Sequence, residues 1–138
     1  MASSRGRPIF VVQKHQARAL HYDFRLEIEG VLKSWAVPKG PSNDPKIKRL
    51  AVMTEDHPME YRKFSGRIPK GEYGAGKVEI WDGGTYVSFK NKDGKFLEKD
   101  VMQGQLEFEL FGKKLTGKWV LFKFGKQGKN WILKKAKN

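Results

Sequence analysis

The feature that most constrains the fold is a series of short runs in which apolar and polar residues alternate. From Tyr22 to Ile28 every second residue is apolar, which is the period of a strand with one buried face. The chain also has 15 glycines and 6 prolines. They interrupt such runs roughly every eight to twelve residues, a spacing typical of β-sandwiches and barrels. We therefore expect an all-β fold.

The runs define the expected elements. Strands are expected at about 9–15, 21–29, 31–37, 49–55, 77–81, 85–90, 105–111, 118–124 and 130–134. Turn residues occur at 29–30 (EG), 82–84 (DGG), 111–114 (FGKK) and 116–117 (TG). Only residues 95–102 have apolar side chains about one helical turn apart. The sequence thus predicts an antiparallel β-barrel of about eight strands with one short helix.

Length and composition are those of one globular domain. With 138 residues, 38% of them apolar, the chain is long enough to bury a core. We expect a single domain over residues 1–138, with a flexible basic segment at residues 1–8. There is no run of 18 apolar residues, no signal-peptide pattern and no cysteine, which excludes disulfides and thiolate chemistry. We expect a cytoplasmic monomer without a membrane partner.

The charge balance favours a polyanionic partner. Lysine and arginine number 28 against 15 aspartate and glutamate residues, which gives a net charge of +13. The excess is densest at 45–50 (PKIKRL) and 125–138 (GKQGKNWILKKAKN). Nucleic acid is favoured over a membrane because no amphipathic helix is evident. A generic solubilising surface is the alternative.

A glycine-rich motif at 71–77 (GEYGAGK) matches the start of a phosphate-binding P-loop but lacks its context. Val78 stands where Ser or Thr would meet Mg²⁺, and the glycines lead into an alternating run rather than a helix. We therefore reject a nucleotide P-loop and expect these glycines to shape a turn.

In the run at 21–29, the face opposite the apolar side chains carries an unusual set of polar residues. It carries His21, Asp23 and Arg25 at every second position, although Asp is a poor strand former. In the preceding run, Gln13 and His15 share one face. If the runs are adjacent, His15, His21 and Asp23 can bind one ion, because residues two apart on a strand are separated by about 6.5 Å. This set suits Mn²⁺, Fe²⁺, Co²⁺ or Zn²⁺; the alternative is a polar face whose His and Asp hydrogen-bond each other.

Other basic and polar groups stand at the ends of later runs. Lys39 lies in a loop that two prolines stiffen. His57 shares the parity of Ala51 and Met53, and Pro58 biases it toward an extended conformation at the strand end. Beside a metal, such groups are typical of a phosphate site, because Arg offers phosphoryl oxygens a planar fork and Lys a point charge.

Four stretches, in this order, resemble a known family: FVVQKHQARALHYDFRLEIEGVLKSWAVPKGPS, KRLAV, EDHPMEY and IPKGEYGAGKVEIWDGGTY. Over about residues 8–124 the chain resembles the 3′-phosphoesterase domain of bacterial and archaeal DNA ligase D. The resemblance implies a β-barrel with its active site in a surface crescent. It also implies Mn²⁺-dependent trimming of DNA 3′ ends during end-joining repair. A diesterase step removes a 3′-terminal ribonucleoside, and a monoesterase step then removes the 3′-phosphate.

Carried over to this chain, the resemblance implies roles for named residues. The metal ligands would be His15, His21 and Asp23. The expected catalytic residues are Arg25, Glu55, His57 and Tyr61, and the expected substrate-binding residues are Gln13, Arg25, Lys39 and Arg49. His57 would either donate a hydrogen bond to the phosphoryl group or protonate the leaving oxygen.

The resemblance also implies partners and a preferred step. The expected partners are DNA with 3′-phosphate or 3′-ribonucleotide ends and a separate ligase, polymerase or Ku protein. Only nine residues precede Phe10, whereas the family has a longer N-terminal arm that helps the diesterase step. We therefore expect monoesterase activity to exceed diesterase activity by more than it does in longer family members.

Two other functional classes fit parts of the sequence. One is a non-catalytic nucleic-acid-binding barrel of the OB type, with Trp35, Trp81 or Trp119 as stacking platforms. The other is an iron oxygenase that uses a two-His, one-carboxylate triad. The net charge of +13 counts against the oxygenase.

Overall fold

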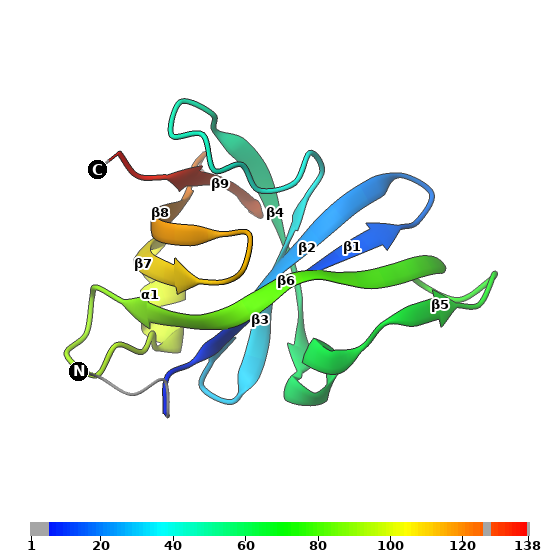
Figure 1. Cartoon of the computed structure of the whole chain (residues 1–138), viewed down its shortest axis with the longest axis horizontal. Coiled ribbons are helices and arrows are strands. Elements are labelled where there is room, and N and C mark those ends of the chain that lie inside the picture. Colours follow the sequence, from blue (N-terminus) through cyan, green and yellow to red (C-terminus); the bar gives the residue numbers. More distant parts are fainter. Residues whose placement is uncertain (1–5, 126–127, 138) are drawn as a thin grey trace.

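The computed structural model describes residues 6–125 and 128–137 (Figure 1). Its strands are β1 (Ile9–Gln16), β2 (Leu20–Ile28), β3 (Val31–Val37), β4 (Arg49–Pro58), β5 (Gly66–Ile68), β6 (Gly76–Ser88), β7 (Gln105–Phe111), β8 (Thr116–Lys123) and β9 (Asn130–Lys135). A 3₁₀ turn, η1 (Met59–Lys63), follows β4, and the short helix α1 (Glu98–Gln103) precedes β7. No helix in the described part of the chain is long and apolar enough to cross a membrane.

Eight of the nine strands close into an antiparallel barrel. The order is β1-β2-β3-β4-β9-β8-β7-β6, and pairing of β1 with β6 closes the ring. The remaining strand, β5, pairs only with β6 and extends from the barrel wall (Figure 1). The sequence-based prediction of a barrel of about eight strands with one short helix is therefore confirmed.

The barrel interior is filled by the apolar face of each strand. Phe24 and Leu26 of β2 are fully buried there, as the alternation in the sequence requires. Trp35 packs edge-on against Trp131, with ring centroids 5.4 Å apart. Trp119 is also in the core. Trp35 and Trp119 are therefore not accessible as nucleic-acid stacking platforms.

The expected turns were partly right. The two-residue turn at 29–30 joins β2 to β3, with positive φ at both Glu29 (48°) and Gly30 (84°). The segment expected at 111–114 falls at the β7–β8 connection, which spans 112–115. The DGG turn is wrong, because β6 runs unbroken through 82–84. The TG turn is also wrong, because Gly117 lies inside β8.

The DGG segment serves tertiary contacts instead of a hairpin. The carboxylate of Asp82 accepts hydrogen bonds from the backbone N–H groups of Lys113 (2.9 Å) and Leu115 (2.8 Å), in the β7–β8 connection. A Cβ atom at Gly84 would lie 2.1 Å from the carbonyl oxygen of Phe111. Glycine is therefore required for the close approach of β6 to β7.

The N-terminal segment is described only in part. Residues 1–5 of the segment expected to be flexible (1–8) lie outside the described residues. Pro8 is buried, and its carbonyl oxygen accepts a hydrogen bond from the backbone N–H of Tyr86. The chain is thus attached to the barrel one residue before β1 begins.

Candidate active site

The first two strands place the expected polar residues side by side. β1 and β2 are antiparallel, and their register pairs His15 with His21 and Gln13 with Asp23. These side chains, with Arg25, point out of the barrel wall because the alternate residues of each strand fill the core. The expectation that the two runs lie adjacent is confirmed.

His15, His21 and Asp23 converge on one point of the outer face. One donor atom from each lies within 4.8 Å of the other two. The two imidazole rings are 4.7 Å apart, centroid to centroid. Asp23 Oδ1 lies 3.2 Å from His21 Nε2, and Asp23 Oδ2 lies 3.6 Å from His15 Nδ1. Two ring nitrogens and a carboxylate are thus directed at one small volume.

Hydrogen bonds to backbone carbonyls set the orientation of both rings. His15 Nε2 donates to the carbonyl oxygen of Gly74 at 2.7 Å, which leaves Nδ1 with a free lone pair facing Asp23. His21 Nδ1 donates to the carbonyl oxygen of Ala19 at 3.3 Å, which leaves Nε2 facing the same carboxylate. Metal-ligating histidines are held in this way in metalloproteins, with the second nitrogen bonded to a carbonyl or carboxylate.

The charges of the cluster are coupled. The hydrogen bond that the His21 ring donates to Asp23 raises the pKa of His21 above its ordinary value, and burial only partly opposes the effect. Burial alone would raise the pKa of Asp23. The hydrogen bond from His21 and the charge of Arg25 outweigh that effect and lower it. Asp23 is therefore a carboxylate at neutral pH, as a metal ligand must be.

Arg25 is buried next to the cluster and held in one orientation. Only 3% of it is exposed. Its Nε donates to Gln13 Oε1 at 2.6 Å, and its Nη1 donates to Ser34 Oγ at 2.8 Å. Its Nη2 lies 3.5 Å from Asp23 Oδ2. Burial lowers the pKa of this guanidinium, and the Asp23 charge opposes that shift; the group stays charged.

Gln13 ties this arginine to the segment that covers the outer face. The Nε2 of Gln13 donates to the backbone carbonyl oxygens of Tyr61 (2.8 Å) and Phe64 (3.1 Å). The Tyr61 ring, in η1, lies over the guanidinium with its centroid 4.9 Å from Arg25 Cζ. Burial raises the pKa of the Tyr61 hydroxyl, so it is protonated at neutral pH.

A β-bulge brings His57 to the outer face. Ser34 of β3 pairs with Thr54 of β4, but two residues earlier Leu32 pairs with His57. β4 therefore uses one extra residue, and the bulge turns His57 to the side of Ser34. Its sequence parity with Met53 would otherwise direct it into the barrel, where Met53 packs.

Ion pairs of Lys33 stabilise the bulge in β4. Lys33, opposite the bulge and 7% exposed, donates to Asp56 Oδ2 at 3.1 Å and to Glu98 Oε1 of α1 at 2.7 Å. Asp56 directly precedes His57. Through Lys33, these ion pairs link the bulged part of β4 to α1.

His57 contacts the guanidinium from the far side of the site. Arg25 Nη1 lies 3.2 Å from His57 Nδ1, and the carbonyl oxygen of Glu55 lies at the same distance. Arginine can only donate, so Nδ1 accepts from it and the neutral ring carries its proton on Nε2. Burial and the positive charge of Arg25 lower the pKa of His57. The ring is neutral at pH 7 as a result.

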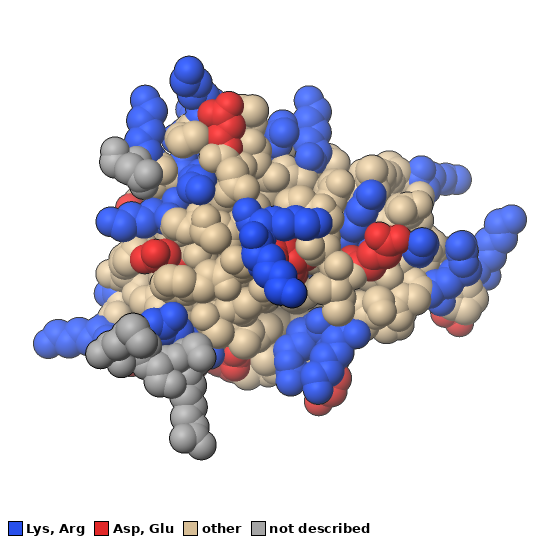
Figure 2. Space-filling model, in the orientation of Figure 1, with Lys and Arg blue, Asp and Glu red and all other residues tan. Residues whose placement is uncertain are grey.

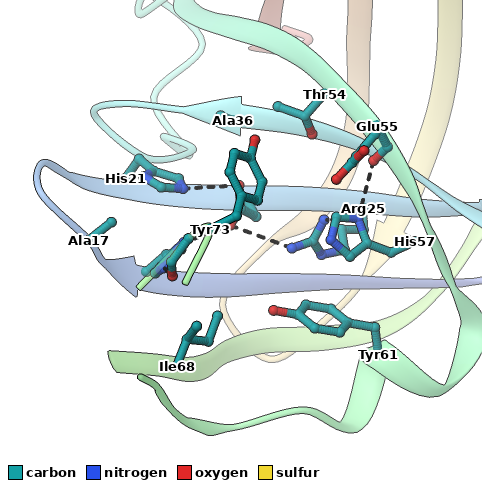
Figure 3. Close-up of a pocket in the computed structure, with 13 residues that line it drawn as sticks. Ala17, His21, Arg25, Ala36, Thr54, Glu55, His57, Tyr61, Ile68 and Tyr73 are labelled. Atoms are coloured by element: carbon teal, nitrogen blue, oxygen red, sulfur yellow. Dashed lines mark hydrogen bonds and ion pairs between the residues drawn. The ribbon is translucent and has the colours of Figure 1, made fainter. Parts of the chain in front are cut away.

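These groups line one cavity of about 300 Å³ (Figure 3). Seven of the ten site residues expected from the sequence are on its wall: His15, His21, Asp23, Arg25, Glu55, His57 and Tyr61. Gln13 is buried behind Arg25 and does not reach the cavity surface. The cavity therefore combines the His/His/Asp cluster, a fixed guanidinium and a neutral histidine.

Lys39 and Arg49 lie elsewhere. Together with Pro38, Lys48 and Leu50 they line a separate groove of about 330 Å³. Arg49 Nε donates to the carbonyl oxygen of Gly40, which fixes the arginine at one wall of that groove. The structure thus does not bring the two residues into the cavity of His57.

Sequence reasoning missed two contributors to the cavity region. Ser34 orients Arg25, and its only sequence signal is a hydroxyl within the otherwise apolar end of VLKSWAV. Tyr73 lines the cavity from the loop between β5 and β6. That loop is the glycine-rich motif, which does shape a turn, but nothing local in it indicates where the turn docks.

The chain is similar to known proteins over the residues that build this site. A family model described as the DNA ligase D 3′-phosphoesterase domain matches residues 13–123. The multifunctional non-homologous end joining protein LigD of Pseudomonas aeruginosa is 52% identical over 131 residues. The LigD DNA repair protein of Mycobacterium tuberculosis is 47% identical over 129 residues, and LigD of Mycolicibacterium smegmatis is 48% identical over 130.

These matches cover nearly all of this chain but little of each relative. Each alignment spans 94% of the chain, and the aligned part is 15–17% of the relative's length. The similarity therefore concerns one domain of a larger protein.

Proposed function

The chain belongs to the family of DNA ligase D 3′-phosphoesterase domains, and from this premise we propose that it is a metal-dependent phosphoesterase that heals DNA 3′ ends in end-joining repair. Its substrates would be ends that carry a 3′-phosphate or a 3′-terminal ribonucleoside. We further propose that residues 1–138 form a single domain that acts as a monomer.

One observation carries the proposal. Asp23 belongs to the His/His/Asp cluster and also lies 3.5 Å from the guanidinium of Arg25. A cation bound to the cluster and the Arg25 fork would therefore flank the same small volume. A tetrahedral phosphoryl group with two or three anionic oxygens is the substrate that such an arrangement suits.

The cluster fits a divalent transition metal held by His15, His21 and Asp23. The donor atoms lie within 4.8 Å of one another, close to the roughly 4.4 Å that two ligands span across one ion at bond lengths of about 2.2 Å. Two imidazoles and one carboxylate suit Mn²⁺, and also Fe²⁺, Co²⁺ or Zn²⁺. A bound ion would supply Lewis-acid polarisation of a phosphate oxygen.

Arg25 and His57 would act on the phosphoryl group directly. Arg25 enters the reaction already oriented by Gln13 and Ser34, so it can stabilise developing charge without reorganisation. His57 would donate a hydrogen bond from Nε2 to a phosphoryl oxygen. Its lowered pKa favours this role over general acid catalysis, which would need the protonated ring.

The other expected residues would have supporting roles. The protonated Tyr61 hydroxyl would be a further hydrogen-bond donor toward the phosphoryl group. Glu55, which lines the cavity, would be a further catalytic residue. Lys39 and Arg49, with Lys48, would bind a phosphate of the DNA backbone away from the reacting end, because they line a different groove.

The charge of the molecule supports a DNA substrate. The chain carries +13, and lysine and arginine outnumber acidic side chains on the face that Figure 2 presents. Such a surface attracts a polyanion over distance. Because a healed end must still be joined, we propose that a ligase, a polymerase or a Ku protein acts on the same DNA.

The test is incubation with a duplex that carries one 3′-phosphate, followed by analysis of the end group. We expect a 3′-hydroxyl end and inorganic phosphate when Mn²⁺ is present, and an unchanged end with excess chelator. A duplex with one 3′-terminal ribonucleotide should be converted in the same way, through a 3′-phosphate intermediate. Binding without turnover would instead favour a non-catalytic barrel, and metal-dependent O₂ consumption would favour an oxygenase.

A further inference from the structure

Tyr73 is the most exposed large apolar side chain among the described residues, at 91%. It stands on the loop between β5 and β6 and lines the candidate active-site cavity. Within the described chain no hydrogen bond or ring contact is made to it. The ring therefore contributes little to the stability of the fold, although it lies beside the His/His/Asp cluster.

The loop holds Tyr73 at this place. The N–H of Ala75 donates to the carbonyl oxygen of Glu72 at 3.1 Å, which closes a turn with Tyr73 and Gly74 at its centre. Gly74 has a φ of 76°, and its carbonyl oxygen receives the hydrogen bond from His15. Tyr73 is thus presented by a turn that is bonded directly to the His/His/Asp cluster.

Gly76 fixes the end of the same loop against β1. Its φ is 135°, and a Cβ atom there would lie 2.1 Å from the carbonyl oxygen of Gln16. The backbone at Gly76 therefore approaches the end of β1 too closely for a larger residue. A ring that the fold already presents in one place loses less conformational entropy on binding than one that must first be ordered.

The cavity has a polar side and an apolar side. In Figure 3, Glu55, His57 and Tyr61 lie on the side of Arg25, where we place the phosphoryl group. Ala17 and Ile68 lie on the opposite side, and the Tyr73 ring lies between His21 and Arg25 in this view. The apolar side offers no charge and few hydrogen bonds, so it suits a planar, largely apolar group rather than a second phosphate.

We propose that Tyr73 stacks on the base of the 3′-terminal nucleoside, so that the apolar side of the cavity is a nucleobase subsite. The inference rests on the proposed function, because the phosphoryl group between the cluster and Arg25 sets where the nucleoside lies. A cavity of about 300 Å³ suits one nucleotide unit. Stacking on an aromatic ring tolerates any base, so the subsite should select a nucleoside without reading its identity.

The test compares Tyr73→Ala with Tyr73→Phe on 3′-phosphate duplexes that end in a normal base or in an abasic sugar. For the normal end we expect Tyr73→Ala to raise KM by about fivefold to 150-fold, the usual range for one lost base stack, with little change in kcat. Tyr73→Phe should retain the parent KM. On the abasic end, Tyr73→Ala and the parent should be equal.

Phe89→Ala is the matched control, because Phe89 is also an exposed aromatic residue (49%) but does not line the cavity; it should behave as the parent does on both ends. An equal loss by Tyr73→Ala on normal and abasic ends would overturn the stacking role. So would an unchanged KM on the normal end.

A binding measurement separates this proposal from the proposed function. With 2-aminopurine as the terminal base of a 3′-phosphate duplex, the emission should change on binding to the parent and Tyr73→Phe, but not to Tyr73→Ala. This outcome would support the subsite even if no phosphate were released. If the parent leaves the emission unchanged, or Tyr73→Ala changes it equally, the subsite does not exist.

Discussion

Arg25 is the residue around which the candidate site is organised. It is 3% exposed and contacts Gln13, Ser34, Asp23 and His57 through its guanidinium. A buried charge is costly unless it is paired, and Asp23 is its only carboxylate partner among the described residues. The same carboxylate belongs to the His/His/Asp cluster, so in the proposed site the binding of a metal and of a phosphoryl group would be linked through one side chain.

Replacing His57 by Ala should separate turnover from metal binding. His57 contacts Arg25 and is not part of the donor cluster. We expect phosphate release to fall by about 10²–10³ in kcat, the usual effect of losing one donor to a transition-state oxyanion, while metal analysis finds the parent content. A variant that has also lost its metal would identify His57 as a ligand.

We expect the free energy of unfolding to fall on acidification because of the titration of His57. Burial and Arg25 hold the pKa of His57 below its ordinary value of 6.5. On acidification the unfolded chain therefore binds a proton at this residue before the folded protein does. Folding stability from this group is lost as the pH falls through 6.5 toward the lowered pKa.

The measurement is urea unfolding of the metal-free protein from about pH 7 to about pH 5. The free energy of unfolding of the parent should fall more steeply than that of His57→Gln, which lacks the titrating group. The raised pKa of His21 contributes in the opposite direction, but it is present in both proteins and cancels in the difference. Equal slopes would show that His57 titrates normally in the folded state.

At the scale of elements, strand periodicity predicted the barrel and the metal-ligand candidates. His15, His21 and Asp23 stand at alternate positions of two runs joined by a short connection, so local pattern alone makes them neighbours. The sequence placed His57 at a strand end, but its parity gave no reason to expect it on the outer face beside Arg25. Its place on the outer face depends on a bulge between β3 and β4, and a bulge is a property of register that a single strand's sequence does not specify.

The error at 82–84 has a similar origin. Asp-Gly-Gly is a strong local hairpin signal, but Asp82 bonds the β7–β8 connection and Gly84 lets β7 approach β6. The tertiary contacts that override the signal come from residues about 30 positions away in sequence, as the separations of the Asp82 bonds indicate. The docking of the Tyr73 loop on His15 was hidden for the same reason, since its partner is distant in the chain.

Asp82→Ala should destabilise the fold without altering the site. Asp82 is 5% exposed, and its carboxylate accepts hydrogen bonds from the N–H groups of Lys113, Lys114 and Leu115. Loss of the carboxylate leaves the buried N–H of Leu115 unpaired and removes two part-buried bonds, so we expect about 1–3 kcal/mol less stability in urea unfolding. Glu60→Ala, an exposed acidic residue, is the control and should stay within about 0.5 kcal/mol of the parent. A similar small loss for Asp82→Ala would mean that water replaces the carboxylate.

At the scale of the whole molecule, the excess of positive charge should appear as salt-dependent DNA binding. The logarithm of the affinity should fall with the logarithm of the salt concentration, with a slope of about −0.9 per phosphate contacted on duplex DNA. Lys48→Gln, in the groove of Lys39 and Arg49, should reduce the magnitude of the slope by about one.

Lys99→Gln is the matched control for that slope. Lys99 lies on α1, across the barrel from β5 in Figure 1, and its loss should leave the slope unchanged. An affinity that does not vary with salt would mean that the net charge of +13 only keeps the protein in solution.

The measurement that tests the proposed site most directly is phosphate release from a 3′-phosphate duplex by the parent and Asp23→Ala, as a function of added Mn²⁺. Asp23 belongs to the donor cluster and contacts Arg25. We expect release by the parent to saturate with one ion per chain and Asp23→Ala to release no phosphate at any Mn²⁺ concentration. Asp93→Ala, outside the cavity, is the control and should match the parent. Release by Asp23→Ala at the parent's rate and metal dependence would contradict the assignment of this cluster as the catalytic metal site.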